Sequence, residues 1–118
     1  MKLISPRIHG YLDIVTVLLF LLAPTLFGLN QLPALLAYSL AIIHLIVTLT
    51  SDFPLGIVKI IPFPIHGWIE RIVGPTLVTI PFILDFSTDE IARNFYIAAG
   101  IVIIAVGLLT DYRNNKIQ

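Results

Sequence analysis

Two short sequences that repeat along the chain contain the residues best suited to chemistry. His9 precedes Asp13 by four residues in IHGYLD, and His66 precedes Glu70 by the same interval in IHGWIE, 57 positions later. Residues four apart lie on one face of a helix, so each histidine is expected to contact its own acid. By ligand type, two imidazoles and several carboxylates suit divalent zinc, manganese, nickel or iron.

Three more charged residues are expected near these pairs. Asp52 in TLTSD and Asp111 in GLLTD each end an apolar segment on the side of the histidines, and Arg71 follows Glu70 directly. The predicted polar cluster therefore comprises His9, Asp13, Asp52, His66, Glu70, Arg71 and Asp111. One interpretation is a structural clasp between neighbouring helices in which Arg71 neutralises a carboxylate. The other is a cation or proton site between the two halves of the chain, for which the sequence specifies no particular metal.

A third histidine lies deeper in an apolar segment. His44, Thr48 and Asp52 are spaced four residues apart and form one polar stripe on a helix. His44 lies about 12 Å from Asp52 along the helix axis, a depth at which an ionisable residue indicates function by default. Three roles fit His44: a neutral imidazole bonded to a neighbouring helix, a proton relay, or an axial haem ligand paired with the same residue of a second copy.

The composition places these residues in a membrane protein. The 118 residues are 58% hydrophobic and 12% charged, with a mean hydropathy of +0.99; soluble domains average about 25% charged residues. Zero net charge without a basic tract gives a nucleic-acid partner no support, and the absence of cysteine excludes disulfides and thiolate metal sites. The expected partner is the lipid bilayer.

Four apolar segments are long enough to cross that bilayer. Residues 8–29, 32–51, 65–86 and 91–110 each approach the roughly 20 residues that a transmembrane helix needs, and none shows the alternation of a barrel strand. The predicted fold is an all-α membrane protein with four transmembrane helices. Turns are expected around Gly28 and around Ser87–Asp89, with Asp89 as an N-cap. The tail, 112–118, is polar and is expected to be frayed.

The repeated cluster divides the single domain, 1–118, into two tandem helix hairpins. Pro24 and Pro81 are also 57 apart. Repeat 1 is predicted at about 6–53, an interfacial connector with three prolines at about 53–64, and repeat 2 at about 65–112. Each repeat has two helices, so the repeats are expected to insert the same way up, related by an axis along the membrane normal. Pro24, Pro75 and Pro81 are interpreted as helix kinks that shape packing.

The cations predict the orientation. Lys2, Arg7, Lys59, Arg71, Arg113 and Lys116 lie near one side, and Arg93 lies on the other. The positive-inside rule therefore predicts a multi-pass protein of the bacterial inner membrane with both termini in the cytoplasm. The first apolar segment contains the repeated cluster and is expected to be retained rather than cleaved as a signal peptide.

The chain resembles the small bacterial SPW-repeat membrane proteins, which consist of two such helix pairs. Ala23-Pro24-Thr25 and Ile80-Pro81-Phe82 stand where that family has Ser-Pro-Trp, so only the proline is retained in each copy. The family has no known function. The resemblance therefore implies a fold and a membrane location but no substrate.

Three classes of function follow. The first is a non-enzymatic structural or accessory subunit, without a cofactor, in a homo-oligomer or larger membrane complex. The second is a small oligomeric transporter or channel for protons or cations that uses His44, Asp52 and the polar cluster. The third is a redox component that binds haem, quinone or a metal. No phosphate-binding loop, nucleophile elbow or HExxH sequence occurs, so enzymatic activity is not expected.

Overall fold

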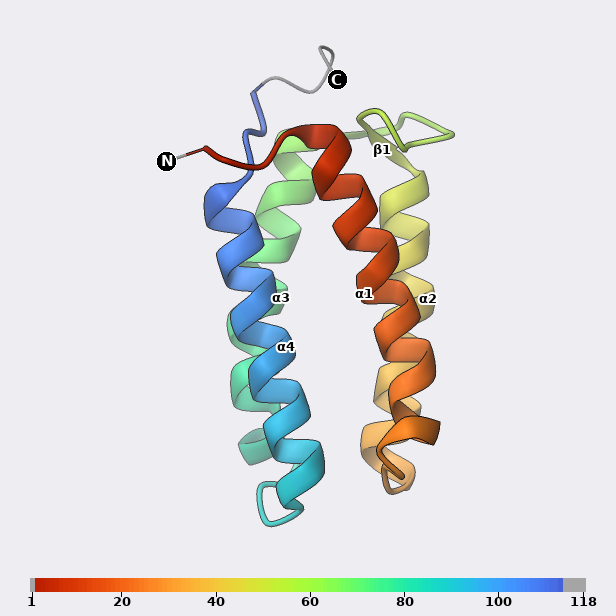
Figure 1. Ribbon diagram of the computed structural model, residues 1–118, viewed down its shortest axis with the longest axis vertical. Helices are drawn as coiled ribbons and strands as arrows, with labels where there is room; N and C mark the ends of the chain where they lie inside the picture. Colours follow the sequence, from red (N-terminus) through yellow and green to blue (C-terminus); the bar gives the residue numbers. More distant parts are fainter. Residues whose placement is uncertain (1, 114–118) are drawn as a thin grey trace.

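The computed structural model describes residues 2–113 and is built almost entirely from helices. They are α1 (Pro6–Leu26), α2 (Gln31–Leu49), α3 (Phe63–Ile83) and α4 (Glu90–Leu109), with two-residue strands β1 (Ser51–Asp52) and β2 (Ile61–Pro62) between α2 and α3. The four predicted helices are confirmed, with ends shifted by a few residues (Figure 1). Most of the predicted frayed tail, including Lys116, lies outside the described residues.

Local chemistry explains where the helices begin and end. The Ser5 hydroxyl accepts a hydrogen bond from the Ile8 backbone N–H and Pro6 occupies the first turn of α1, where its missing N–H costs nothing. The Asp89 carboxylate accepts from the Ala92 backbone N–H, which confirms the N-cap predicted for α4. After α1, Gly28 adopts a φ of 60°, a left-handed conformation that glycine adopts without strain.

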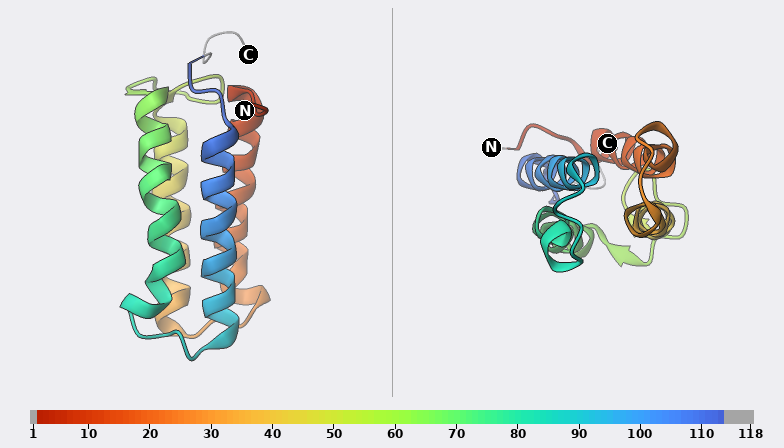
Figure 2. Two further views of the ribbon diagram at one scale, coloured as in Figure 1. Left: turned by 90° about the vertical axis from the view of Figure 1, so that its left-hand side faces the viewer. Right: turned by 90° about the horizontal axis from the view of Figure 1, so that it is seen from below.

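The helices form two antiparallel hairpins that stand side by side. α1 packs on α2 and α3 packs on α4. Seen along the bundle, α1 and α3 occupy diagonal corners, so α1 neighbours α4 and α2 neighbours α3 (Figure 2). The start of α1 and the end of α4 lie at the same end of the bundle, beside the connector between α2 and α3 (Figure 1).

Three of the four helices are long and apolar enough to span a membrane: α1, α2 and α4. α3 has a comparable length of 21 residues but is less apolar, because its first turns contain His66, Glu70 and Arg71. Large hydrophobic side chains are exposed along all four helices, among them Leu22, Ile42, Ile72 and Val102. An outer surface of this kind matches hydrocarbon rather than water.

A small interior core holds the hairpins together below the polar end. Phe20 of α1, Leu77 of α3 and Tyr96 of α4 are all at most 2% exposed. Tyr96 donates a hydrogen bond of 2.7 Å to the backbone carbonyl of Pro33, which links α4 to the start of α2. The prolines Pro24, Pro75 and Pro81 lie inside α1 and α3, which continue through them.

Backbone pairing joins the hairpins at the polar end. β1 pairs with β2 in parallel, with Ser51 opposite Ile61. Ile4, just before α1, forms a parallel bridge with Thr110, just after α4. In each case the segment that leads into one hairpin pairs with the segment that leaves the other, so neither hairpin can move away at this end without breaking both bridges.

Candidate metal centre

Four buried side chains from two helices converge at the polar end of the bundle. His9 and Asp13 come from α1, and His66 and Glu70 come from α3. One ligand atom from each residue can be chosen so that all four atoms lie within 4.8 Å of one another. Both histidines are fully buried, and the two acids are 3% and 4% exposed. The structure therefore brings together the two repeated motifs predicted from the sequence.

The contacts inside this centre run within and between the helices. The His9 Nε2 lies 3.2 Å from Asp13 Oδ1 and 3.1 Å from Glu70 Oε1. The His66 Nε2 lies 2.9 Å from Glu70 Oε2 and 3.2 Å from Asp13 Oδ2. Each imidazole thus faces its own helix's acid, as its four-residue spacing predicts, and also the acid of the other hairpin.

Two hydroxyl groups hold the far sides of the imidazole rings. The His9 Nδ1 lies 2.8 Å from Thr110 Oγ1, and the His66 Nδ1 lies 2.7 Å from Ser51 Oγ. Each hydroxyl belongs to the opposite hairpin and is fully buried. The centre is therefore braced across the hairpin interface on both sides.

The hydroxyl geometry determines which imidazole nitrogen carries a proton. Thr110 Oγ1 lies 2.6 Å from the backbone carbonyl of Val106, and Ser51 Oγ lies 2.6 Å from that of Val47. A carbonyl has no hydrogen, so at this distance the hydroxyl must donate to it. The hydroxyl then accepts from the imidazole, and both Nδ1 atoms are N–H donors. Both Nε2 atoms are consequently left to face the carboxylates.

An Nε2 lone pair cannot face a carboxylate oxygen at about 3 Å without something positive between them. Two protons, one on each Nε2, would supply this charge and balance the two carboxylates. One divalent metal ion would balance them equally well. Nitrogen and oxygen ligands about 2.1 Å from a metal lie roughly 3.0 to 3.4 Å apart in octahedral and tetrahedral sites. The distances between the imidazole Nε2 atoms and the carboxylate oxygens, 2.9 to 3.2 Å, are close to this range.

Aromatic rings close the centre at the polar end of the bundle. Phe53, Phe63 and Tyr112 are at most 7% exposed and pack on one another. Their ring centroids lie 5.5 to 6.4 Å from that of His9. The Tyr112 hydroxyl donates a long hydrogen bond of 3.4 Å to Glu70 Oε1. Burial, and secondarily the charge of Glu70, raise the pKa of Tyr112, so the phenol remains a neutral donor.

His44 joins the same centre from α2. Its Nε2 lies 3.2 Å from Asp13 Oδ1 and 3.9 Å from Glu70 Oε2. Thr48, one turn away, donates to the His44 carbonyl and lies 3.4 Å from Asp13 Oδ2. The sequence suggested a separate, deeper site for His44, whereas the structure makes it a third imidazole around the same carboxylates. This contact occupies the face of Nε2 that an axial haem ligand would need.

The other predicted members of the polar cluster lie outside the centre. Asp52 is half-buried and lies in β1, beyond the end of α2, so the helical stripe consists of His44 and Thr48. Asp111 accepts at 3.5 Å from the exposed Arg113 guanidinium. Arg71 stacks over the rings of Trp68 and Tyr112 at 4.9 and 5.7 Å rather than pairing with a carboxylate of the centre.

Sequence reasoning missed the two bracing hydroxyls, although a signal for them existed. Ser51 and Thr110 each directly precede an acid that ends an apolar segment, and they are 59 positions apart, as those acids are. The acids, Asp52 and Asp111, were predicted as members of the polar cluster because they are charged. Their neighbours, the uncharged hydroxyls, are the residues that reach the imidazoles.

The fold and the site define a helical protein with membrane-compatible helices and a buried histidine–carboxylate centre between two hairpins. Comparison of the chain with known protein families, with curated proteins and with solved structures gives no match.

Proposed function

We propose that this chain is an integral membrane protein whose two like-oriented hairpins bind one divalent first-row transition metal at the interface between them. His9, Asp13, His66 and Glu70 supply the ligands, and His44 is the nearest additional donor. Three imidazoles with two carboxylates suit iron, manganese or zinc. The centre belongs to a small membrane protein that works alone, as a homo-oligomer or as an accessory subunit of a larger complex.

The membrane arrangement is supported by helix length and by charge. α3 has 21 residues and runs antiparallel to α4, so at about 1.5 Å per residue it covers the same thickness as its neighbours. Two of its ionisable groups face the interior, because His66 and Glu70 are buried. Lys2 lies just before α1 and Arg7 at its start, Lys59 lies in the connector and Arg113 follows α4. These segments are at the end of the bundle that holds the centre, which favours a cytoplasmic location for that end in a bacterial inner membrane.

Duplication of one hairpin is supported by the backbone bridges. Ile4 and Ile61 are 57 positions apart, and their partners Thr110 and Ser51 are 59 apart. These are the same offsets that relate the two histidines and the two acids after the apolar segments. A duplicated hairpin places two copies of one imidazole–acid pair around a common axis, which accounts for a centre made of matched halves.

The observation that carries the metal assignment is the orientation of the two imidazoles. Each ring donates from Nδ1 to a hydroxyl of the opposite hairpin and points Nε2 at both carboxylates. Metal-binding histidines characteristically have their second nitrogen held in this way, which fixes the tautomer and the ring orientation. The four imidazole–carboxylate distances, 2.9 to 3.2 Å, are close to the separations of ligand atoms around one metal ion.

A structural clasp held by protons is the second candidate. Within residues 2–113, every buried side-chain nitrogen and oxygen atom has a hydrogen-bonding partner without any ion. Two protonated imidazoles between two carboxylates would satisfy the centre, and its role would then be to join the hairpins.

Titration with Co²⁺ separates the two candidates. Purified protein in detergent, stripped with a chelator, is expected to bind one equivalent of Co²⁺ with visible d–d absorption and to gain thermal stability. Glu70→Gln and His66→Gln, which preserve side-chain volume, are expected to lose this absorption. Asp111→Asn is the matched control, because it removes an acid at the same end but outside the centre. A folded wild-type protein without Co²⁺ binding would establish the proton clasp instead.

A further inference from the structure

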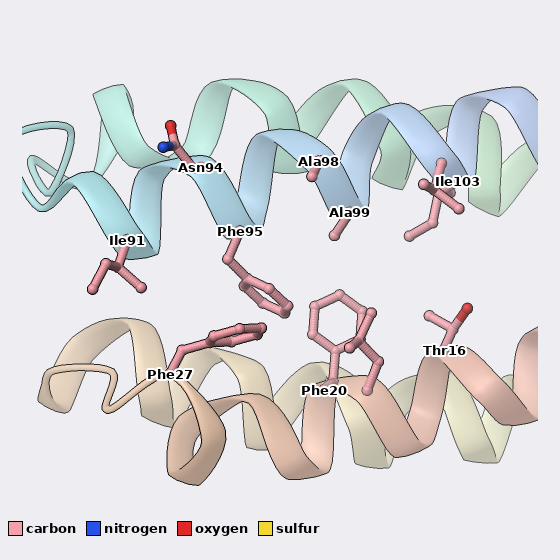
Figure 3. Close-up of a pocket in the computed structure, with 11 residues that line it drawn as sticks. Thr16, Phe20, Phe27, Ile91, Asn94, Phe95, Ala98, Ala99 and Ile103 are labelled. Atoms are coloured by element: carbon pink, nitrogen blue, oxygen red, sulfur yellow. The ribbon is translucent and has the colours of Figure 1, made fainter.

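A long apolar groove runs between α1 and α4 below the centre. Its volume is about 530 Å³, and eleven side chains line it, nine of them apolar. Phe20 of α1 and Phe27, the residue that caps α1, meet Phe95 of α4 in its middle, with ring centroids 5.6 and 5.8 Å from that of Phe95 (Figure 3). Thr16 lies toward the end nearer the centre, and the groove faces the surroundings of the helices at hydrocarbon depth.

A much smaller cavity lies between this groove and the centre. It measures about 10 Å³ and is lined by Asp13, His44 and Glu70. Thr16, Val102 and Ile103 line both this cavity and the groove. These three side chains therefore form the boundary between the two spaces, and Asp13 and Glu70 line the cavity behind it.

The size of the small cavity limits what can occupy it. About 10 to 15 Å³ holds one water molecule. A catalytic or ligand-binding metal, unlike a structural one, keeps one coordination position for water or another small ligand. A one-water cavity next to two metal-binding carboxylates is the space that such a position requires.

We propose that the metal at this centre keeps one exchangeable position, and that a small neutral diatomic molecule such as dioxygen or nitric oxide reaches it from the hydrocarbon through the groove. This inference rests on the proposed metal centre. It concerns binding alone, with a water molecule leaving as the diatomic arrives.

The two routes to the centre explain why a neutral ligand is favoured. On the water-facing side, Phe53, Phe63 and Tyr112 are at most 7% exposed and cover the imidazoles. On the hydrocarbon side, the groove offers almost no polar partner to a charged species, whose desolvation is costly. Neutral diatomic gases dissolve readily in hydrocarbon and are among the smallest ligands that could replace a single metal-bound water molecule.

Nitric oxide is the probe, and the Fe²⁺-loaded protein in lipid nanodiscs is the sample. Elemental analysis first verifies one iron per chain, so a failure of the metal centre is seen before any ligand is added. Stopped-flow absorbance then measures nitrosyl formation, and azide serves as the charged, water-soluble comparison. Elemental analysis without iron would overturn the metal centre and this inference together.

Two tryptophan variants test the route. Val102→Trp fills the boundary between groove and cavity, whereas Ile101→Trp adds the same bulk one residue away, outside both spaces. The two positions are 56% and 55% exposed, so both variants are expected to fold and to bind iron normally. Val102→Trp is expected to slow nitrosyl formation at least about tenfold, the factor given by about 1.4 kcal/mol of added barrier, while Ile101→Trp leaves the rate unchanged.

Three results would overturn the inference while leaving the metal centre intact. The first is iron-loaded protein that binds nitric oxide equally fast in wild type and Val102→Trp, or not at all. The second is azide binding that matches nitric oxide binding, which would place the access route in water. The third is a lipid chain that copurifies with wild type and blocks nitrosyl formation until it is removed, which would assign the groove to lipid instead.

Discussion

At the scale of residues, the centre depends on uncharged groups as much as on charged ones. His9 and His66 each have one nitrogen held by a hydroxyl of the opposite hairpin and the other directed at two carboxylates. Without Thr110 and Ser51, each ring could rotate or adopt its other tautomer. The hydroxyls thus fix the orientation of both imidazole rings, so that each Nε2 points at the carboxylates.

Removal of a bracing hydroxyl is expected to weaken the metal centre without removing a ligand. Thr110→Val deletes the acceptor for the His9 Nδ1–H while keeping the volume, and loss of such an outer partner typically lowers metal affinity about 10- to 100-fold. Competition between the protein and a chromophoric chelator measures this affinity. Thr76→Val is the control, because Thr76 is exposed and bonds only to its own helix at the Ile72 carbonyl. Equal affinities in Thr110→Val and wild type would show that the hydroxyl does not orient the ligand.

Tyr112 gives the protein a specific sensitivity to alkaline pH. Its pKa is raised in the folded state, chiefly by burial, whereas an unfolded tyrosine ionises at about pH 10. Below that pH the folded protein has its full stability, and as the pH rises above it the unfolded state gains from ionising Tyr112 while the folded state does not. Chemical denaturation is expected to show wild type more stable than Tyr112→Phe at pH 8, with the difference shrinking at pH 11. A difference that stays constant would show that Tyr112 ionises equally in both states.

The sequence predicted the four side chains of the centre better than their surroundings. The four-residue spacing of His9 with Asp13 and of His66 with Glu70 was sufficient, because helix geometry alone fixes those contacts. The approach of His44 to Asp13 depends on how α2 packs on α1, and helical spacing within one segment carries no information about that packing. Arg71 was expected to neutralise a carboxylate, but aromatic rings of Trp68 and Tyr112 attract it instead.

At the scale of elements, the pairing of α3 with α4 depends on two glycines. A Cβ added to Gly100 would lie 2.6 Å from the Gly74 carbonyl oxygen and 2.9 Å from the Val78 backbone nitrogen. These are backbone atoms that cannot rotate away, so the absence of a side chain allows the two helices to come this close.

Gly100→Ala is therefore expected to destabilise the hairpin by about 1 to 3 kcal/mol, the usual cost of overpacking. Thermal unfolding in detergent, followed by circular dichroism, measures the effect. Gly107→Ala, seven residues further along the same helix, is the matched control: its added Cβ would find only the Tyr112 hydroxyl, 3.9 Å away. That variant is expected to be neutral or slightly stabilising, since alanine favours a helix over glycine. Similar losses in both variants would contradict the close contact at Gly100.

The conformation of the connector between α2 and α3 was predicted only in part. Its three prolines correctly excluded a continuous helix between α2 and α3. The pairing of β1 with β2, and of Ile4 with Thr110, was not predicted, because each involves segments that only the folded bundle brings together. Two-residue strands have no periodicity that a sequence could display.

At the scale of the whole molecule, the bundle is joined most firmly at one end. The backbone bridges, the hydroxyl braces and the four-residue centre all lie where α1 and α3 begin. Farther down, α1 and α4 are separated by a groove of about 530 Å³, bridged by the rings of Phe20, Phe27 and Phe95. A metal ion would thus tie together two hairpins that otherwise share a small core.

Cysteine labelling tests whether α3 crosses the bilayer with the others. The chain contains no cysteine, and Lys59 and Thr88, at opposite ends of α3, are both exposed. In intact cells a membrane-impermeant maleimide is expected to label Thr88→Cys and to spare Lys59→Cys, because the positive-inside rule keeps the connector in the cytoplasm. Permeabilised cells supply the control, in which both react. Labelling of both positions from outside intact cells would mean that α3 does not cross the membrane.

X-ray absorption spectroscopy at the edge of the bound metal tests the proposed centre most directly. In protein loaded with one equivalent of Zn²⁺, the spectrum is expected to show nitrogen and oxygen neighbours at about 2.0 to 2.2 Å, together with the outer-shell scattering of at least two imidazole rings. Thr110→Val is expected to weaken the imidazole scattering, since His9 would lose its fixed orientation. A metal surrounded by oxygen alone, or a folded protein that retains no metal, would contradict the assignment of this centre.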